Sequence, residues 1–203
     1  MTEVAIGVVS VLLGVVADRV LGFYFERKAE EEQLSRVRIL VALEIDRNLS
    51  EVSRVWDEVN RNKEGLDPQL SALGKDLLLA RKLVRLPWPH WTRTAWEGQS
   101  TLISAALTTS QITQIHQLHT RLDALTAVRD TLARLDVEDR ERWFAIATHH
   151  GGSVPINQII GPFDVIAPAL WIQYVTTTTE VLDRGNVLEA DLDTSTKPSL
   201  PAS

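Results

Sequence analysis

Four histidines are the residues of this sequence whose type and spacing could bind a metal ion. His116 and His119 lie one helical turn apart, and His149 and His150 follow further along the chain. No carboxylate stands between the first two, although metal sites in helical bundles usually combine histidines with matching carboxylates. We therefore expect polar or half-buried histidines on a surface helix, with no metal and no cofactor. A metal-dependent enzyme is our third and weakest hypothesis.

Glu44 and Asn48 form a second pair that could do chemistry, because they lie one helical turn apart beside an apolar stripe. The spacing identifies no partner base or nucleophile for either of them. We expect both side chains to enter the helical core and to hydrogen-bond a tryptophan N–H such as that of Trp96. The pair predicts a structural contact, and we assign no catalytic residue.

Common enzyme motifs are missing from the rest of the sequence. There is no cysteine, which excludes disulfides, thiolate metal sites and cysteine nucleophiles. His150-Gly151-Gly152-Ser153 is similar to the glycine loop of α/β hydrolases, but no Gly-x-Ser-x-Gly elbow accompanies it. Phosphate-binding loops and dinucleotide fingerprints are also absent. The formal net charge of -6 argues against nucleic acid as the main partner.

Residues 77–96 form a local basic and aromatic stretch without any acidic side chain. Tryptophan beside arginine or lysine suits the headgroup region of an anionic leaflet, so we consider a contact with the membrane surface. The residues of this candidate surface are Arg81, Lys82, Arg85, Trp88, Trp91 and Arg93. In the alternative that we favour, the tryptophans fill the core and the basic side chains face water. Single-stranded nucleic acid is a third and weaker interpretation.

The first 25 residues have the length and polarity of a transmembrane helix. From Val4 to Phe25 only Asp18, Arg19 and two hydroxyl groups are polar, and a helix of about 22 residues rises roughly 33 Å. Basic residues follow this segment, which predicts that the N-terminus lies outside and the C-terminal domain in the cytoplasm. A cleaved signal peptide is the competing interpretation, but the first three residues carry no basic side chain. We expect a single-pass protein of the inner membrane whose partner is the lipid bilayer.

Small residues form one stripe along this predicted span, because steps of three and four residues return to the same helix face. The stripe consists of Gly7, Ser10, Gly14, Ala17 and Asp18. Small residues let helices approach closely in lipid, so we expect a homo-oligomer, or a protein partner, held through this face. Alternatively, the stripe is incidental and Asp18 and Arg19 lie near the headgroups. A further hypothesis is a membrane effector whose spans oligomerise and perturb permeability, with a pore lined by Asp18 as its extreme form.

Helices must position all of these residues. Apolar residues at three- and four-residue steps predict a helix through residues 34–59 that ends at Gly65, a second from Pro68 to the prolines at 87–89, and a third over 91–107. A long helix capped by Ser110 follows. Its a and d positions hold Ile115, Leu118, Leu122, Leu125, Leu132 and Leu135, with Arg129 interrupting. A solvated acidic cluster starts a shorter helix at 137–149, and a buried helix ends at Gly185.

The sequence therefore predicts an all-α fold. A transmembrane anchor at 1–25 continues without a linker into a cytosolic α-helical domain at 26–190, and a disordered tail occupies 191–203. The order of three short motifs resembles a loose group of bacterial membrane-anchored proteins. These motifs are Phe25-Glu26-Arg27-Lys28, Leu43-Glu44-Ile45-Asp46-Arg47-Asn48 and Thr94-Ala95-Trp96-Glu97. The resemblance supports the topology alone. We expect a membrane-tethered interaction module, such as a scaffold, an adaptor or a sensor subunit.

Overall fold

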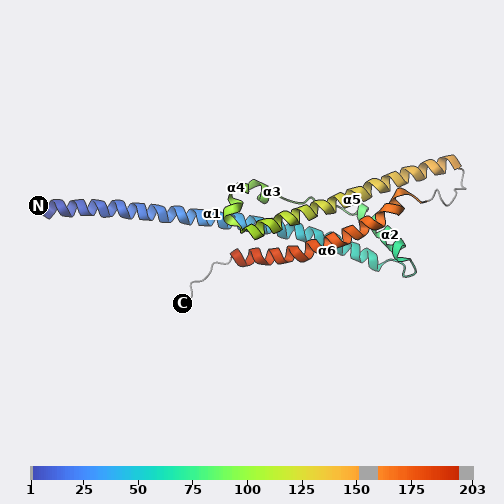
Figure 1. Cartoon of the computed structure of the whole chain (residues 1–203), viewed down its shortest axis with the longest axis horizontal. Helices are drawn as coiled ribbons and strands as arrows, with labels where there is room; N and C mark the ends of the chain where they lie inside the picture. Colours follow the sequence, from blue (N-terminus) through green and yellow to red (C-terminus); the bar gives the residue numbers. More distant parts are fainter. Residues whose placement is uncertain (1, 151–159, 197–203) are drawn as a thin grey trace.

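The computed structural model is a bundle of helices from which one end of the first helix projects (Figure 1). It describes the backbone of residues 2–150 and 160–196, and the side chains of residues 18–146, 148 and 160–193. Within these ranges there is no strand. The helices are α1 (Thr2–Glu64), α2 (Ala72–Arg85), α3 (Thr94–Gly98), α4 (Ser100–Ala106), α5 (Thr109–His150) and α6 (Pro162–Thr196). The predicted all-α class is confirmed.

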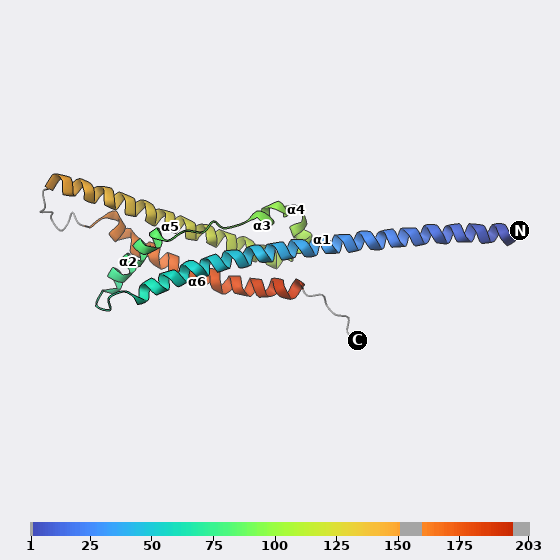
Figure 2. The same cartoon turned by 180° about the vertical axis from the view of Figure 1, so that it is seen from behind.

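Helix α1 is one uninterrupted helix of 63 residues, so the predicted absence of a linker after residue 25 is confirmed. At about 1.5 Å per residue it is roughly 95 Å long. Every side chain from Asp18 to Gln33 is exposed, and this part of the helix stands clear of the bundle from both sides (Figures 1 and 2). The helix ends at Glu64, directly before the predicted stop at Gly65. One rigid element therefore connects the N-terminal segment to the core.

Among the residues whose side chains are described, no helix is long and apolar enough to span a bilayer. The predicted anchor at 1–25 falls mostly on residues 1–17, which lie outside that part of the chain. The transmembrane anchor therefore stays a prediction.

Three long helices share the hydrophobic core. Helix α6 packs against α1, α2 and α5, and it runs antiparallel to α5 (Figure 1). All six apolar side chains predicted at the a and d positions of α5 are buried. On α1 the buried apolar residues are Val37, Val41, Ile45, Leu49, Val52, Val55 and Val59. Amphipathic stripes of period 3.6 thus explain how the long helices pack.

Helix α5 differs from its prediction at both ends. Thr108, rather than Ser110, caps its start: the Gln111 N–H donates to Thr108 Oγ1 at 3.2 Å, and the Thr108 N–H donates to Gln111 Oε1 at 3.0 Å. This is a capping box, which satisfies two backbone donors at once. The expected break near residue 137 is wrong, because Asp136 and Asp139 are buried side chains of one continuous helix.

Helix α6 continues through Gly185 to Thr196, so the predicted helix end at Gly185 is wrong. Gly185 lies in the buried series that includes Val181 and Leu188, and a Cβ built there would lie 2.2 Å from Leu49 Cδ2. The glycine is needed because α1 approaches closely, not because the helix stops. Residues 191–196 of the predicted tail are helical, and its remainder lies outside the described residues.

The short helices also begin later than predicted. Ser71 caps α2 by accepting a hydrogen bond from the Gly74 N–H at 3.1 Å, so the helix starts after Pro68. It ends at Arg85, before the prolines, as predicted. The single helix expected over 91–107 is divided into α3 and α4. An extended segment replaces the first part of that helix.

We predict that Gly185→Ala lowers the free energy of unfolding by about 1–3 kcal/mol, because the new methyl group overlaps Leu49 in a packed core. Alanine has a higher helix propensity than glycine, so propensity alone would make the variant more stable. A loss of stability would therefore come from the packing overlap. Urea denaturation is the measurement. Gly98→Ala is the matched control, because nothing lies within 4 Å of a Cβ built at Gly98. Equal or greater stability of Gly185→Ala would contradict the close approach.

Candidate functional site

The strap, which we define as residues 86–98, joins α1 to α5 through polar contacts. On the α1 side, Asn48 Nδ2 donates to the Thr92 carbonyl and Asn48 Oδ1 accepts from the Thr92 N–H, both at 2.9 Å. Glu44 Oε2 accepts from the Ala95 N–H at 2.7 Å. The prediction that Glu44 and Asn48 enter the core is confirmed. The expected tryptophan partner is wrong, because both side chains bond the strap backbone.

On the α5 side the strap is held by its own side chains. The indole N–H groups of Trp88 and Trp91 both donate to Thr126 Oγ1, at 3.2 and 2.8 Å. Arg93 donates to the carbonyl of His119 at 3.2 Å and also pairs with the Asp123 carboxylate. Strap residues therefore bond to both long helices, and these hydrogen bonds fix its backbone where no regular helix can.

A carboxyl group and an imidazole face each other beneath the strap. Glu44 is 7% exposed and His119 is 3% exposed. Glu44 Oε1 and His119 Nε2 are 3.9 Å apart, and neither atom has a hydrogen-bond partner among the described residues. The edge of Trp96 contacts the imidazole, with ring centroids 5.8 Å apart. This is the most strongly desolvated acid–base pair that the described part of the chain contains.

Both groups are driven towards their neutral forms. Burial raises the pKa of Glu44 above its usual range, and the hydrogen bond from Ala95 opposes that rise. Burial also lowers the pKa of His119 to about 4, with the positive charge of Arg93 acting in the same direction and Asp123 opposing it. Desolvation disfavours the charged form of each group. Because the pKa of His119 lies near 4, its imidazole is uncharged at neutral pH, and both groups are buried away from solvent.

A second polar cluster anchors the start of α6. Arg81 Nη2 lies 3.1 Å from Asp139 Oδ2 and 3.3 Å from Asp164 Oδ1, and its guanidinium carbon lies 4.9 Å from the ring centroid of Phe163. The Gly161 N–H donates to Asp164 Oδ2 at 3.1 Å. Burial raises the pKa of Asp139, Asp164 raises it further and Arg81 opposes both. The cluster joins α2, α5 and α6, and the Arg81 guanidinium is paired with the carboxylates of Asp139 and Asp164.

The metal candidates whose side chains are described, His116 and His119, differ in their surroundings. His116 is exposed whereas His119 is buried, and the side chains of His149 and His150 lie outside the described residues. Within the described residues, no group of three His, Cys, Asp or Glu side chains is placed to hold a metal ion. The observed role of His119 is to face Glu44.

Five of the six candidate membrane-surface residues have partners inside the protein. Trp88 and Trp91 are half-buried and pack on the core. Arg81 binds the second cluster, Lys82 donates to Asn62 Oδ1 at 2.8 Å and Arg93 holds the strap. Arg85 is exposed at the end of α2. The packing of the tryptophans agrees with the alternative in which they fill the core, whereas the paired Arg81 and Arg93 differ from its expectation that the basic side chains face water, and the membrane-surface contact stays a prediction.

The predicted association face of the span lies mostly beyond the described side chains. Gly7, Ser10, Gly14 and Ala17 are in α1, but their side chains fall outside the description. Asp18 is described and is exposed. Self-association through this face stays a prediction.

Sequence reasoning missed Asp139 and Thr126. Asp139 follows Leu125 and Leu132 at seven-residue spacing, so the heptad register could have placed it in the core. Arg129, which interrupts the apolar pattern, donates to the Val84 carbonyl at the end of α2 at 3.4 Å. The signal in the sequence was a polar residue at a position where the helical repeat predicts an apolar one, which indicates a buried polar contact. Nothing in the sequence pointed to Thr126.

No protein-family model, curated protein or solved structure matches this chain. The resemblance to bacterial membrane-anchored proteins therefore stays a prediction, and the function must be argued from the residues alone.

We predict that His119 makes the stability pH-dependent between about pH 6.5 and pH 4. Its pKa is about 4 in the folded chain and near 6.5 when exposed, so the stabilisation is complete above pH 6.5 and is lost as the pH falls towards 4. A shift of this size corresponds to on the order of 3 kcal/mol. Urea denaturation at pH 7 and pH 4 should show that His119→Gln loses less stability than the parent. The exposed His116→Gln is the control, and identical pH dependence of all three would contradict this assignment.

We predict that Asn48→Ala frees the strap. The change removes the hydrogen bonds to the backbone and to the hydroxyl of Thr92 and leaves part-buried backbone groups unpaired, which should cost about 1–3 kcal/mol. Amide hydrogen exchange at residues 86–98 should become faster. Asn62→Ala is the control, because Asn62 bonds Glu58 of its own helix and Lys82 of α2, and neither lies in the strap. Unchanged exchange in Asn48→Ala would show that other contacts hold the strap.

Proposed function

We propose that this protein is a membrane-tethered, non-enzymatic helical interaction module. Its anchor is the N-terminal part of α1, and its bundle is the binding domain, acting as a scaffold, an adaptor or a sensor subunit. The bundle lies in the cytoplasm and the N-terminus lies outside the inner membrane.

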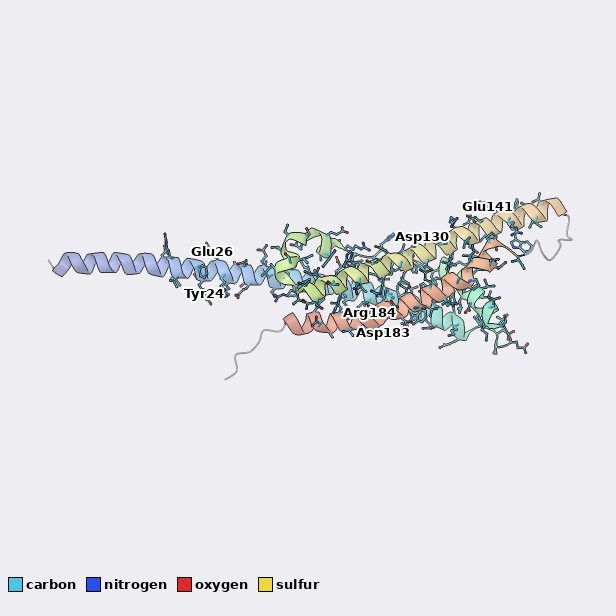
Figure 3. The ribbon with its side chains drawn as sticks, viewed as in Figure 1. Tyr24, Glu26, Asp130, Glu141, Asp183 and Arg184 are labelled. Carbon is cyan, nitrogen blue, oxygen red and sulfur yellow. The ribbon has the colours of Figure 1, made fainter. Side chains whose placement is uncertain are left out.

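A collar of exposed apolar side chains on the projecting part of α1 carries this proposal. The collar consists of Val20, Leu21, Phe23, Tyr24 and Phe25, which are 53–66% exposed. Tyr24 lies on the projecting helix, away from the bundle (Figure 3). Five neighbouring apolar side chains in water are unfavourable, and Tyr is enriched where a membrane helix leaves the bilayer. The collar is the C-terminal edge of the apolar segment that begins at Val4.

The polarity of α1 changes abruptly after the collar. Glu26 follows Phe25 directly, and Arg27 pairs with Glu31 at 3.5 Å one turn later. Such a change within one helix is what a boundary between lipid and water requires. Arg27 and Lys28 lie just past this boundary, and basic residues favour the cytoplasmic side.

The interior of the bundle supports binding rather than catalysis. Glu44 and His119, which form a desolvated acid–base pair, are buried beneath the strap. The nearby hollow of about 530 Å³ is lined by Trp88, Trp91 and Arg93, and the Arg93 guanidinium is paired with Asp123. These groups hold the strap in place, so a partner would recognise the outer faces of the helices.

We predict that the full-length chain floats with lipid vesicles and resists extraction by alkaline carbonate. A charged pair in the apolar segment, Leu12→Arg with Val15→Arg, should abolish both properties because charges in the bilayer interior are costly. Leu73→Arg on α2 is the control, because Leu73 is 55% exposed and lies outside the anchor. Flotation that disappears in the control, or a parent chain that stays with the soluble fraction, would contradict the proposal.

A further inference from the structure

The outward face of α1, which we define as its exposed residues from Arg36 to Arg61, carries an unpartnered apolar patch. Helical geometry places this face opposite the buried stripe through Val41 and Ile45. The face is polar except where Ile39, Leu40 and Leu43 are 45%, 46% and 59% exposed. Nothing in the packing of the bundle explains why three apolar side chains gather at this place.

Charges of opposite sign flank the patch on its two sides. Steps of about 100° per residue place Arg36 and Arg47 on one side of Leu43 and Asp46 on the other. On the acidic side, Glu189 of α6 lines the same hollow as Leu43 and Asp46. The surface therefore has basic side chains on the Leu40 side of Leu43 and acidic side chains on the Ile39 side.

This arrangement is self-complementary. In two parallel helices related by a two-fold axis, the same apolar residues meet at the axis, and each edge of one copy meets the opposite edge of the other. The Arg47 guanidinium of one copy would then face the Asp46 and Glu189 carboxylates of the second. An unrelated partner would have to reproduce both charge edges, whereas a second copy supplies them by symmetry.

We propose that two copies of this chain pair in parallel through the outward face of α1, centred on Leu43. The parallel direction rests on the proposed membrane anchor, which would bring both copies out of the bilayer on the same side. Phe25 precedes Leu43 by 18 residues, which is about five helical turns, so both lie on one line of α1. Gly7 lies another 18 residues earlier, which continues the line into the predicted small-residue stripe.

Confinement to a membrane is what makes so small a patch sufficient. Three exposed apolar side chains bury little area, far less than a stable dimer in solution needs. Two anchored copies meet at a high effective concentration and in one orientation, which removes much of the cost of association. Pairing through the outward face then fixes the orientation of each bundle about the axis of α1.

Cysteine cross-linking of the full-length chain in vesicles tests this pairing, because the sequence contains no cysteine. Leu43→Cys should form a disulfide-linked dimer under mild oxidation, since equivalent positions at a two-fold axis lie close together. Leu73→Cys is the matched control, with 55% exposure on α2. Equal cross-linking of the two variants in vesicle-bound protein would overturn the proposal.

Charge reversal tests the arrangement of the edges. Added to Leu43→Cys, Arg47→Asp should lower the dimer yield at least threefold, whereas Arg47→Lys should preserve it. Undiminished cross-linking with Arg47→Asp would overturn the parallel two-fold geometry. Failure of the chain to bind vesicles would contradict the membrane anchor, whereas vesicle binding without cross-linking at position 43 would contradict only the pairing.

Discussion

The uninterrupted backbone of α1 is the constraint on which the rest of the structure depends. Its C-terminal half supplies one wall of the core, from Val37 to Val59, and its N-terminal part projects from the bundle. A helix cannot turn one part about its axis without turning the other, so the buried stripe fixes which residues of the projecting part face each direction. The positions of the collar and of the outward face both follow from this.

Polar contacts complete the bundle where apolar packing cannot. The strap bonds to α1 through Asn48 and Glu44 and to α5 through Thr126 and Asp123, which fixes a segment of irregular chain and one short helix. Arg81 performs the same task where α2, α5 and α6 meet. Buried polar groups of this kind specify one arrangement, because misplacing them leaves desolvated atoms unpaired. Because burial lowers the pKa of His119, we expect acid to destabilise the contacts beneath the strap.

The sequence correctly predicted the helices whose apolar residues recur with a regular period. The prediction failed where a residue type that often marks a helix end or a solvated surface has a different structural role. The leucines from Leu118 to Leu135 revealed the core face of α5, because burial repeats with the helical turn. Gly185 suggested a helix end, but its missing side chain accommodates Leu49. Asp139 suggested a solvated surface, and its pairing with Arg81, distant in sequence, offsets part of the cost of its burial. Such long-range pairs leave no local signal.

Amide hydrogen exchange across residues 26–33 of the vesicle-bound full-length chain tests the central claim most directly. This stretch is fully solvated and lacks support from the core, so its helix persists only if it is held at both ends. We predict protection that continues without a gap from the collar into the bundle. Exchange in this stretch at the rate of an unstructured peptide would mean that a flexible linker separates the anchor from the bundle, and would contradict the account.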